Sequence, residues 1–147
     1  MRRVLKLLTL SLVTLVSCSH NIETEKVDYV TIIPEEHEYS EISEYELLWE
    51  SMFEVEEDHY VYIYSLTCSH CNEIKNDLIE IALKRGDIYF VKGTSKDQIS
   101  NDVEKSKNAE NPGDIWILGY PTLLKIENKK CTKNIAGKTQ IMNEIKL

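Results

Sequence analysis

Residues 59–71 have the sequence His-Tyr-Val-Tyr-Ile-Tyr-Ser-Leu-Thr-Cys-Ser-His-Cys, and they contain the clearest structural signal in the chain. The first seven residues are rich in β-branched and aromatic side chains and are apolar on both faces, so they predict a central strand that is covered on two sides. The pattern then changes to helical spacing as far as Arg85, and Gly86 follows two basic residues. This change predicts a helix over residues 68–85, with two cysteines at the junction of strand and helix.

The elements on either side alternate between helices and strands. Residues 41–53 carry an apolar stripe at helical spacing and predict an amphipathic helix. The other predicted elements are strands at 27–33, 87–92, 122–127 and 130–136, a weakly helical stretch at 95–109, a turn at 111–113, a hairpin turn at 128–129 and a final helix at 138–147. Alternation followed by a closing hairpin predicts an α/β fold with a central mixed β-sheet flanked by helices.

Length and charge restrict the class of protein. The chain has 147 residues and 42% hydrophobic residues, which is typical of one globular domain with a core. It has 17 Lys and Arg against 25 Asp and Glu, which gives a net charge of −8. Because phosphate binding depends mostly on Lys and Arg, we expect no nucleic acid partner. The acidic runs at 35–38 and 54–58 are interpreted as solvated surface, with a preference for basic partners as the alternative.

The N-terminal residues differ in composition from the rest of the chain. Three basic residues precede an apolar run over residues 7–16, which is shorter than the about 20 residues that a membrane-spanning helix requires. The run ends in Leu15-Val16-Ser17-Cys18, which resembles a lipobox, where cleavage precedes the cysteine and the cysteine is lipidated. An ordinary signal peptide with a chance cysteine and a short buried helix are the alternatives.

The lipobox implies a mature protein that begins at Cys18. Removal of residues 1–17 leaves 130 residues and changes the net charge from −8 to −11. We expect a polar tether over residues 18–26 and a domain over residues 27–147. A diacylated cysteine provides stable anchoring, so the domain is expected at the extracytoplasmic face of the cell membrane, where disulfides persist.

The Cys68-Ser69-His70-Cys71 motif is the part of the chain that predicts chemistry. Two cysteines three residues apart on the first helical turn are close enough for a disulfide, and a helix N-terminus favours a thiolate over a thiol. Cys71 is in register with the apolar face of the helix, so we expect it to be the buried resolving thiol. Cys68 is then the exposed nucleophile, and a protonated His70 would add positive charge beside its thiolate.

Other roles of the cysteines are less well supported. A zinc site needs four ligands, but the other cysteines are Cys18 and Cys131 and the histidines are scattered, so we expect neither a metal nor another cofactor. A purely structural disulfide is disfavoured, because so short a loop constrains the unfolded chain little. Cys131 is interpreted as a small buried hydrophobic residue, with a regulatory or resolving thiol as the alternative.

Residues 60–71 resemble the central strand and active-site turn of thioredoxin-like proteins. Residues 119–126, Gly-Tyr-Pro-Thr-Leu-Leu-Lys-Ile, resemble the segment in which that family places a cis-proline before a strand, and a hairpin, Gly137 and a last helix follow in family order. The resemblance implies a thioredoxin-like fold and a cis bond between Tyr120 and Pro121 that packs against the disulfide. It also implies that backbone groups of Tyr120 pair with an extended substrate.

The active-site sequence differs from that of thioredoxins. Thr67 replaces Trp, Ser-His replaces Gly-Pro, and Tyr62 stands six residues before the first cysteine, where thioredoxins usually carry a buried Asp. The proton acceptor for Cys71 is therefore open, with Glu73 or water as weak substitutes. The Ser-His pair is closer to the Pro-His of periplasmic disulfide-forming oxidases, which favours an oxidising direction. Those oxidases, however, carry a helical insertion between their strands, and 130 residues leave no room for one.

The sequence thus predicts a membrane-anchored, extracytoplasmic thiol–disulfide oxidoreductase. Its expected partners are cysteine-containing extracytoplasmic proteins or peptides, the membrane through the lipid anchor, and a membrane redox partner. The alternative is a thioredoxin-fold lipoprotein that holds or escorts a secreted peptide without redox turnover, as accessory proteins of bacteriocins do. A surface lipoprotein without a redox role is a third hypothesis.

Overall fold

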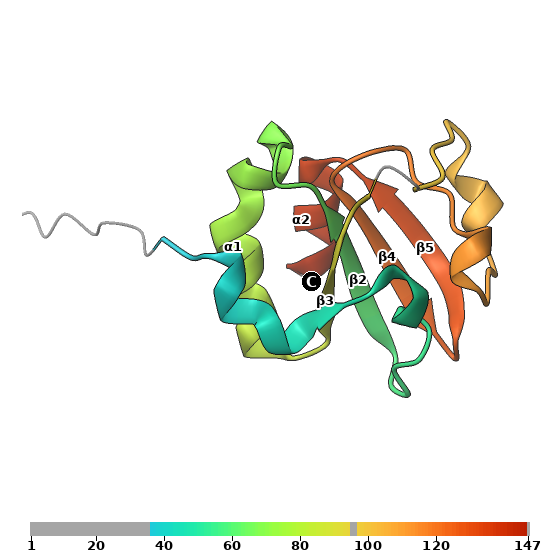
Figure 1. Ribbon diagram of the computed structural model, residues 1–147, viewed down its shortest axis with the longest axis horizontal. Coiled ribbons are helices and arrows are strands. Elements are labelled where there is room, and N and C mark those ends of the chain that lie inside the picture. Colours follow the sequence, from blue (N-terminus) through green and yellow to red (C-terminus); the bar gives the residue numbers. More distant parts are fainter. Residues whose placement is uncertain (1–35, 95–96, 147) are drawn as a thin grey trace, which may run out of the picture. The chain divides into compact units, whose positions relative to one another are not determined.

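The computed structural model describes residues 36–94 and 97–146, which contain a five-stranded mixed sheet with the order β1-β3-β2-β4-β5 (Figure 1). The expected signal peptide, the lipidated Cys18, the tether and the strand at 27–33 lie outside the described residues. The strands are β1 (Glu46–Leu47), β2 (His59–Tyr64), β3 (Ile88–Lys92), β4 (Thr122–Glu127) and β5 (Lys130–Ala136). The helices are α1 (Ser69–Arg85) and α2 (Lys138–Ile145), with 3-10 turns η1 (Tyr39–Tyr45), η2 (Trp49–Ser51), η3 (Val103–Ser106) and η4 (Pro112–Asp114).

Strand β2 is the centre of the sheet, as the sequence predicts. All six of its residues are buried, and it pairs in parallel with β3 and antiparallel with β4. Because side chains alternate along a strand, its three tyrosines enter one core, and Val61 and Ile63 enter the core on the opposite face. This double burial explains why the strand is apolar on both sides.

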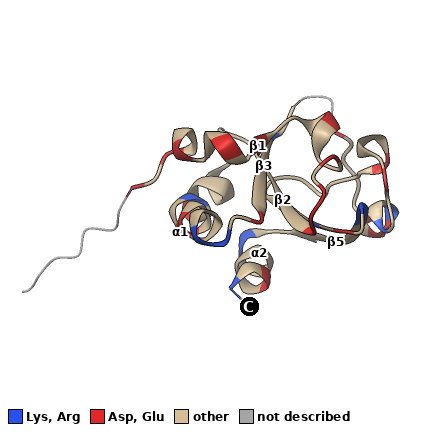
Figure 2. Ribbon diagram, turned by 90° about the horizontal axis from the view of Figure 1, so that it is seen from below, with Lys and Arg blue, Asp and Glu red and all other residues tan. Residues whose placement is uncertain are grey.

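The two faces of the sheet are covered in different ways. Helices α1 and α2 pack on the tyrosine face of β2 (Figure 1). The other face is covered by irregular segments and short 3-10 turns, which contribute Met52, Phe53, Ile115 and Ile117 to the core. Acidic and basic residues occur together on the surface elements (Figure 2), and many form ion pairs such as that between Arg85 and Asp87 at 2.7 Å.

Helix α1 begins and ends where the sequence predicts. Cys68 is its N-cap, and Gly86 follows its last turn with a φ of 75°, a backbone conformation that glycine adopts without strain. Its buried side chains are Cys71, Ile74, Leu78, Ile79 and Ala82. The prediction that Cys71 lies on the apolar face of this helix is therefore confirmed.

The predicted helix over residues 41–53 is wrong. The segment forms η1, strand β1 and η2 instead, and β1 pairs in parallel with β3 through Glu46↔Phe90 and Leu47↔Val91. Ile42 and Met52 are buried as expected, but Leu48, which belongs to the same predicted stripe, is 73% exposed. Strand pairing with a distant segment therefore outweighs the local helical pattern.

The C-terminal half agrees more closely with the expected elements. Asn128 and Lys129 both have positive φ angles, as the tight turn of a β-hairpin requires, so the predicted hairpin is confirmed. Helix α2 covers most of the expected final helix. Of the expected weak helix at 95–109, the structure describes residues 97–109, and within these only η3 is helical. Before η3, Ile99 pairs with Ile117 in an isolated bridge.

Candidate active site

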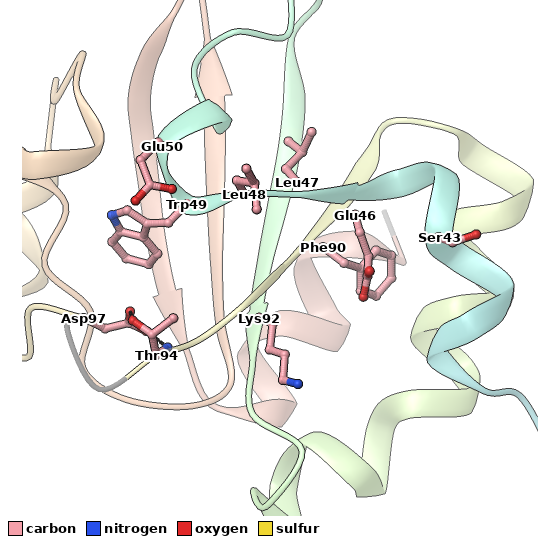
Figure 3. Close-up of a pocket in the computed structure, with 10 residues that line it drawn as sticks. All are labelled: Ser43, Glu46, Leu47, Leu48, Trp49, Glu50, Phe90, Lys92, Thr94 and Asp97. Carbon is pink, nitrogen blue, oxygen red and sulfur yellow. Dashed lines mark hydrogen bonds between the residues drawn. The ribbon is translucent and has the colours of Figure 1, made fainter.

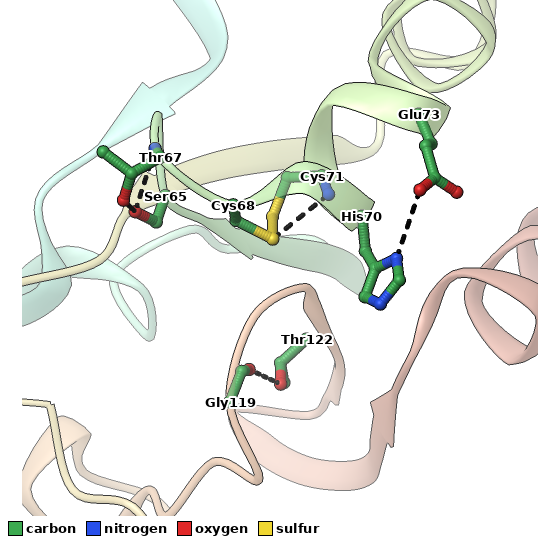
Figure 4. Close-up of a disulfide and its surroundings, with 8 residues drawn as sticks. All are labelled: Ser65, Thr67, Cys68, His70, Cys71, Glu73, Gly119 and Thr122. Carbon is green, nitrogen blue, oxygen red and sulfur yellow. Dashed lines mark hydrogen bonds and ion pairs between the residues drawn. A yellow bond between two sulfur atoms is a disulfide. The ribbon is translucent and has the colours of Figure 1, made fainter.

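Cys68 and Cys71 form a disulfide at the start of α1 (Figure 4). Their Cα atoms are 5.2 Å apart, within the ordinary range for a disulfide. Cys71 is fully buried beneath the helix, whereas Cys68 is partly exposed. Of the two cysteines, Cys68 is therefore the one that an incoming thiol can approach from solvent.

The Cys68 sulfur occupies the N-cap position of α1. The backbone N–H of Cys71 donates a hydrogen bond to Cys68 Sγ at 3.1 Å, and the N–H of Asn72 donates to the Cys68 carbonyl at 3.2 Å. After reduction, a thiolate at Cys68 has an N–H donor and the positive end of the helix dipole beside it. Burial among apolar side chains disfavours a thiolate at Cys71. The structure thus makes the two sulfurs chemically unequal in the direction that the sequence predicts.

The turn that leads into the disulfide is fixed by its own polar groups. The Cys68 N–H donates to the Ser65 carbonyl at 3.1 Å, and the Thr67 N–H donates to Ser65 Oγ at 3.4 Å. The hydroxyl groups of Ser65 and Thr67 are also hydrogen-bonded, at 3.1 Å (Figure 4). Leu66, between them, is half exposed. This turn connects the end of β2 to Cys68 and presents one apolar side chain beside the site.

His70 lies on the exposed side of the first turn of α1. Its side chain is 61% exposed, and Nδ1 is 3.4 Å from Glu73 Oε1 (Figure 4). Glu73 is also paired with Lys138, and the lysine lowers the pKa of this carboxyl group, with a smaller contribution from His70. Glu73 is therefore an ionised, exposed partner of Lys138 and His70, and its negative charge opposes part of the effect that a protonated His70 would have on Cys68.

Tyr62 does not replace the buried carboxylate of thioredoxins. Its side chain is fully buried, and its hydroxyl group lies close enough to that of Tyr39 for each to influence the other's pKa. Burial is the main reason why the pKa of Tyr62 is raised. A phenol that keeps its proton at neutral pH cannot accept one from Cys71, so the acid–base chemistry at this position differs from that of a carboxylate.

The segment before β4 lies beside the disulfide. The Tyr120–Pro121 peptide is cis, as the resemblance implies, and Gly119 and Thr122 of the same loop appear next to the two cysteines in Figure 4. The Thr122 hydroxyl donates to the Gly119 carbonyl at 2.7 Å, which closes the loop. The side chain of Tyr120 packs against the same core as Cys68. The pairing of Tyr120 backbone groups with a substrate stays a prediction.

Sequence reasoning missed two residues that hold this loop. The ring of Tyr120 lies against Gly93, directly after β3, and its hydroxyl group donates to Asp97 Oδ2 at 2.5 Å. Neither residue belongs to a recognisable motif. The one signal in the sequence is a glycine placed immediately after a buried strand, where a close backbone approach is common.

Cys131 is remote from this chemistry. It is fully buried on β5, in the core on the opposite face of the sheet from Cys71. Burial raises the pKa of its thiol to about 11. The expectation that Cys131 behaves as a small buried hydrophobic residue is therefore supported.

A surface pocket of about 690 Å³ lies along β1 and the end of β3, and it contains neither cysteine of the disulfide (Figure 3). It is lined by Ser43, Glu46, Leu47, Leu48, Trp49, Glu50, Phe90, Lys92, Thr94 and Asp97.

Among residues 36–94 and 97–146, no three His, Cys, Asp or Glu side chains gather closely enough to hold a metal ion. No helix in the same part of the chain is long and apolar enough to cross a membrane.

The mixed sheet, the helices that flank it, the cysteine pair at the start of α1 and Pro121 before β4 define a thioredoxin-like fold. In this fold the oxidised cysteine pair lies at the start of α1, next to the end of the central strand β2.

Comparisons with known proteins find structural similarities at low sequence identity. No protein-family model matches the sequence, and no curated protein sequence matches it. Thioredoxin f2 of Chlamydomonas reinhardtii is 18% identical with a TM-score of 0.43, over 68% of this chain and 91% of that chain. Mitochondrial thioredoxin 3 of Saccharomyces cerevisiae, in its oxidised form, is 18% identical with a TM-score of 0.46, over 69% of this chain and 92% of that chain.

Proposed function

We propose that the protein is a lipid-anchored thiol–disulfide oxidoreductase that acts outside the cytoplasmic membrane through Cys68 and Cys71. The observation that carries this proposal is the inequality of the two sulfurs. Cys68 is partly exposed and its Sγ accepts the helix N-cap hydrogen bond, whereas Cys71 is fully buried. A purely structural disulfide needs neither feature.

The exchange reaction proceeds in two substitutions at sulfur. A substrate thiolate attacks Cys68 Sγ, a mixed disulfide forms, and the bond to Cys71 breaks so that Cys71 leaves as a thiolate and takes up a proton. A second substrate thiolate then attacks the substrate sulfur of the mixed disulfide, and Cys68 leaves as a thiolate at the helix N-terminus. The substrate loses two electrons and gains a disulfide, and the Cys68–Cys71 pair is reduced.

The oxidising direction is favoured by the N-cap position of Cys68. Stabilisation of the thiolate stabilises the reduced form of the pair, which raises its reduction potential. A protonated His70 acts in the same direction, although its largely exposed side chain and the neighbouring Glu73 reduce the effect. A membrane redox partner that accepts two electrons then reoxidises the pair. Operation in the opposite direction would reduce the same class of substrates.

The lipobox Leu15–Cys18 supports the proposed location. Acylation of Cys18 would hold the domain at the outer face of the membrane, where cysteine-containing extracytoplasmic proteins or peptides are the substrates within reach. The same location supplies a membrane redox partner.

Trapping of mixed disulfides tests the proposed activity. In cells that express the full-length protein, Cys71→Ala is expected to accumulate covalent complexes, because its Cys68 thiolate attacks the disulfide of an oxidised substrate and the Cys71 thiol that would attack Cys68 Sγ to release the complex is lost. Cys68→Ala should trap few, and Cys131→Ala serves as a matched control that should trap none. If Cys71→Ala traps no protein and the wild type neither reduces insulin nor reactivates scrambled ribonuclease, the redox proposal is wrong and the peptide-holding alternative is favoured.

A further inference from the structure

The ring of Tyr120 is held in a space that only glycine leaves open. A Cβ atom added to Gly93 would lie 2.3 Å from both Cε1 and the hydroxyl oxygen of Tyr120, far inside van der Waals contact. Gly93 is itself attached to the end of β2, because its N–H donates to the Tyr64 carbonyl at 2.7 Å. The residue that precedes Pro121 is thus packed against the same strand end from which the chain continues to Cys68.

The hydroxyl group of Tyr120 is bound by a carboxylate that is already organised. It donates to Asp97 Oδ2 at 2.5 Å and approaches the Thr94 carbonyl at 3.3 Å. The same carboxylate accepts the Thr94 N–H at 3.1 Å and the Thr94 hydroxyl at 2.9 Å, and Figure 3 shows Thr94 and Asp97 together on one wall of the pocket. Hydrogen bonds to an ionised acceptor are stronger than those between neutral groups.

The tyrosine is suited to remain a donor in this contact. Burial and the hydrogen bond to Asp97 raise the pKa of Tyr120, so its hydroxyl group keeps its proton at any physiological pH. The phenol therefore supplies its hydrogen to the carboxylate throughout the range in which the exchange reaction operates.

A second set of contacts ties the loop to the segment that carries Asp97. The Ile117 N–H donates to the Gln98 carbonyl at 2.8 Å, and the Ser100 N–H donates to the Ile117 carbonyl at 2.9 Å. Residues 97–100 therefore run along the chain that enters the loop, while Asp97 holds the Tyr120 side chain. The loop before Pro121 is therefore attached to residues 97–100 through the backbone of Ile117 and through the side chain of Tyr120.

We propose that Asp97 is a positioning residue for substrate recognition, which holds Tyr120 and thereby sets the orientation of the backbone before Pro121 toward an extended peptide substrate. The proposal rests on the proposed function, because it assigns a role in the same exchange reaction. Asp97 acts through Tyr120 and touches neither sulfur of the disulfide. Its loss should weaken recognition of extended chains and leave the reactivity of the cysteine pair as it is.

Kinetics with two disulfides of different size separate recognition from sulfur chemistry. The full-length protein and the variants Asp97→Asn, Tyr120→Phe and the double variant are assayed with insulin and with bis(2-hydroxyethyl) disulfide, with dithiothreitol as electron donor. Loss of one charge-assisted hydrogen bond is expected to raise KM for insulin about tenfold in each single variant. The double variant should be no weaker than either single variant, because both changes remove the same contact. Turnover of the small disulfide should change less than about twofold, well below the effect of one such bond.

Amide hydrogen exchange tests the contact without any turnover. Peptides that cover residues 117–122 should exchange faster in Asp97→Asn and Tyr120→Phe, and they should be unchanged in the matched controls Asp114→Asn and Tyr89→Phe. If the wild type is inactive but residues 117–122 still exchange faster in the two variants, the proposed function is wrong, whereas the contact between Asp97 and Tyr120 is confirmed. Unchanged exchange in Asp97→Asn, additive effects in the double variant, or equal slowing with both disulfides would each overturn the role of Asp97.

Discussion

Substitution of Cys131 tests which thiol groups of the protein are chemically available. Burial raises the pKa of this thiol to about 11, compared with an ordinary value of 9.0. Because the folded state holds the proton more tightly than the unfolded state, stability is complete below pH 9 and falls as the pH rises through this interval. With these two values, ionisation of Cys131 costs about 1.4 kcal/mol of unfolding free energy at pH 10.

Urea unfolding of the wild type and of Cys131→Ala, with the Cys68–Cys71 disulfide intact, measures this cost. Each protein is unfolded at pH 7 and at pH 10, and the loss of stability between the two values is compared. In the unfolded state the tyrosines of both proteins ionise near pH 10, so their contribution to the loss of stability cancels. The packing cost of the missing sulfur is present at both pH values and also cancels. The wild type should lose about 1.4 kcal/mol more than the variant.

The alkylation rate of Cys131 supplies an independent readout. With a pKa of about 11, about one thiol in a thousand is ionised at pH 8, so iodoacetamide should modify the native protein slowly and the urea-unfolded protein rapidly. An equal loss of stability in the wild type and in Cys131→Ala, together with rapid alkylation of the native thiol, would refute the argument. Cys131 would then be available as a third redox-active group.

Three further predictions concern the site and the anchor. His70→Ala should lower the reduction potential of the disulfide by less than about 30 mV, because the imidazole is mostly exposed and faces Glu73. Equilibration with glutathione measures this potential, and a higher potential in the variant would contradict the prediction. Cys18→Ser should move the protein from the membrane to the soluble fraction or block its processing, whereas a cleaved variant that stays with membranes would exclude the lipid anchor. Gly93→Ala should lower the unfolding free energy by about 1–3 kcal/mol, because the added methyl group overlaps the Tyr120 ring; in urea unfolding, Tyr120→Ala should recover part of this loss, and an additive double variant would contradict the overlap.

The unit formed by β2 and α1 could be predicted from the sequence because its signals are local. The apolar strand, the N-cap cysteine and Gly86 lie within thirty consecutive residues, and each determines the conformation of its own neighbourhood. The buried position of Cys71 followed from helical spacing alone. The positions of Cys68 and Cys71 at the start of α1 and the burial of Cys71 could therefore be predicted from the sequence.

The remaining features depend on contacts between distant segments. Residues 46–47 pair with residues 90–91, and nothing within the segment 41–53 indicates that a strand interrupts its helical pattern. Asp97 meets Tyr120 across 23 positions of sequence, from a stretch with weak periodicity. A hydrogen bond between side chains so far apart leaves no mark in local propensity. The fold was accessible to sequence reasoning, but the residues that orient the loop before Pro121 were not.

The placement of the two cysteines on one helical turn also determines how long a covalent complex lasts. Because their Cα atoms are 5.2 Å apart, attack of Cys71 on a mixed disulfide at Cys68 is a unimolecular step. Its rate is governed by a high effective concentration of the second thiol and is independent of the concentration of free thiols in the surroundings. This step restores the Cys68–Cys71 disulfide and releases the substrate unchanged, so it limits the time in which a second substrate thiolate can attack the complex and complete the oxidation.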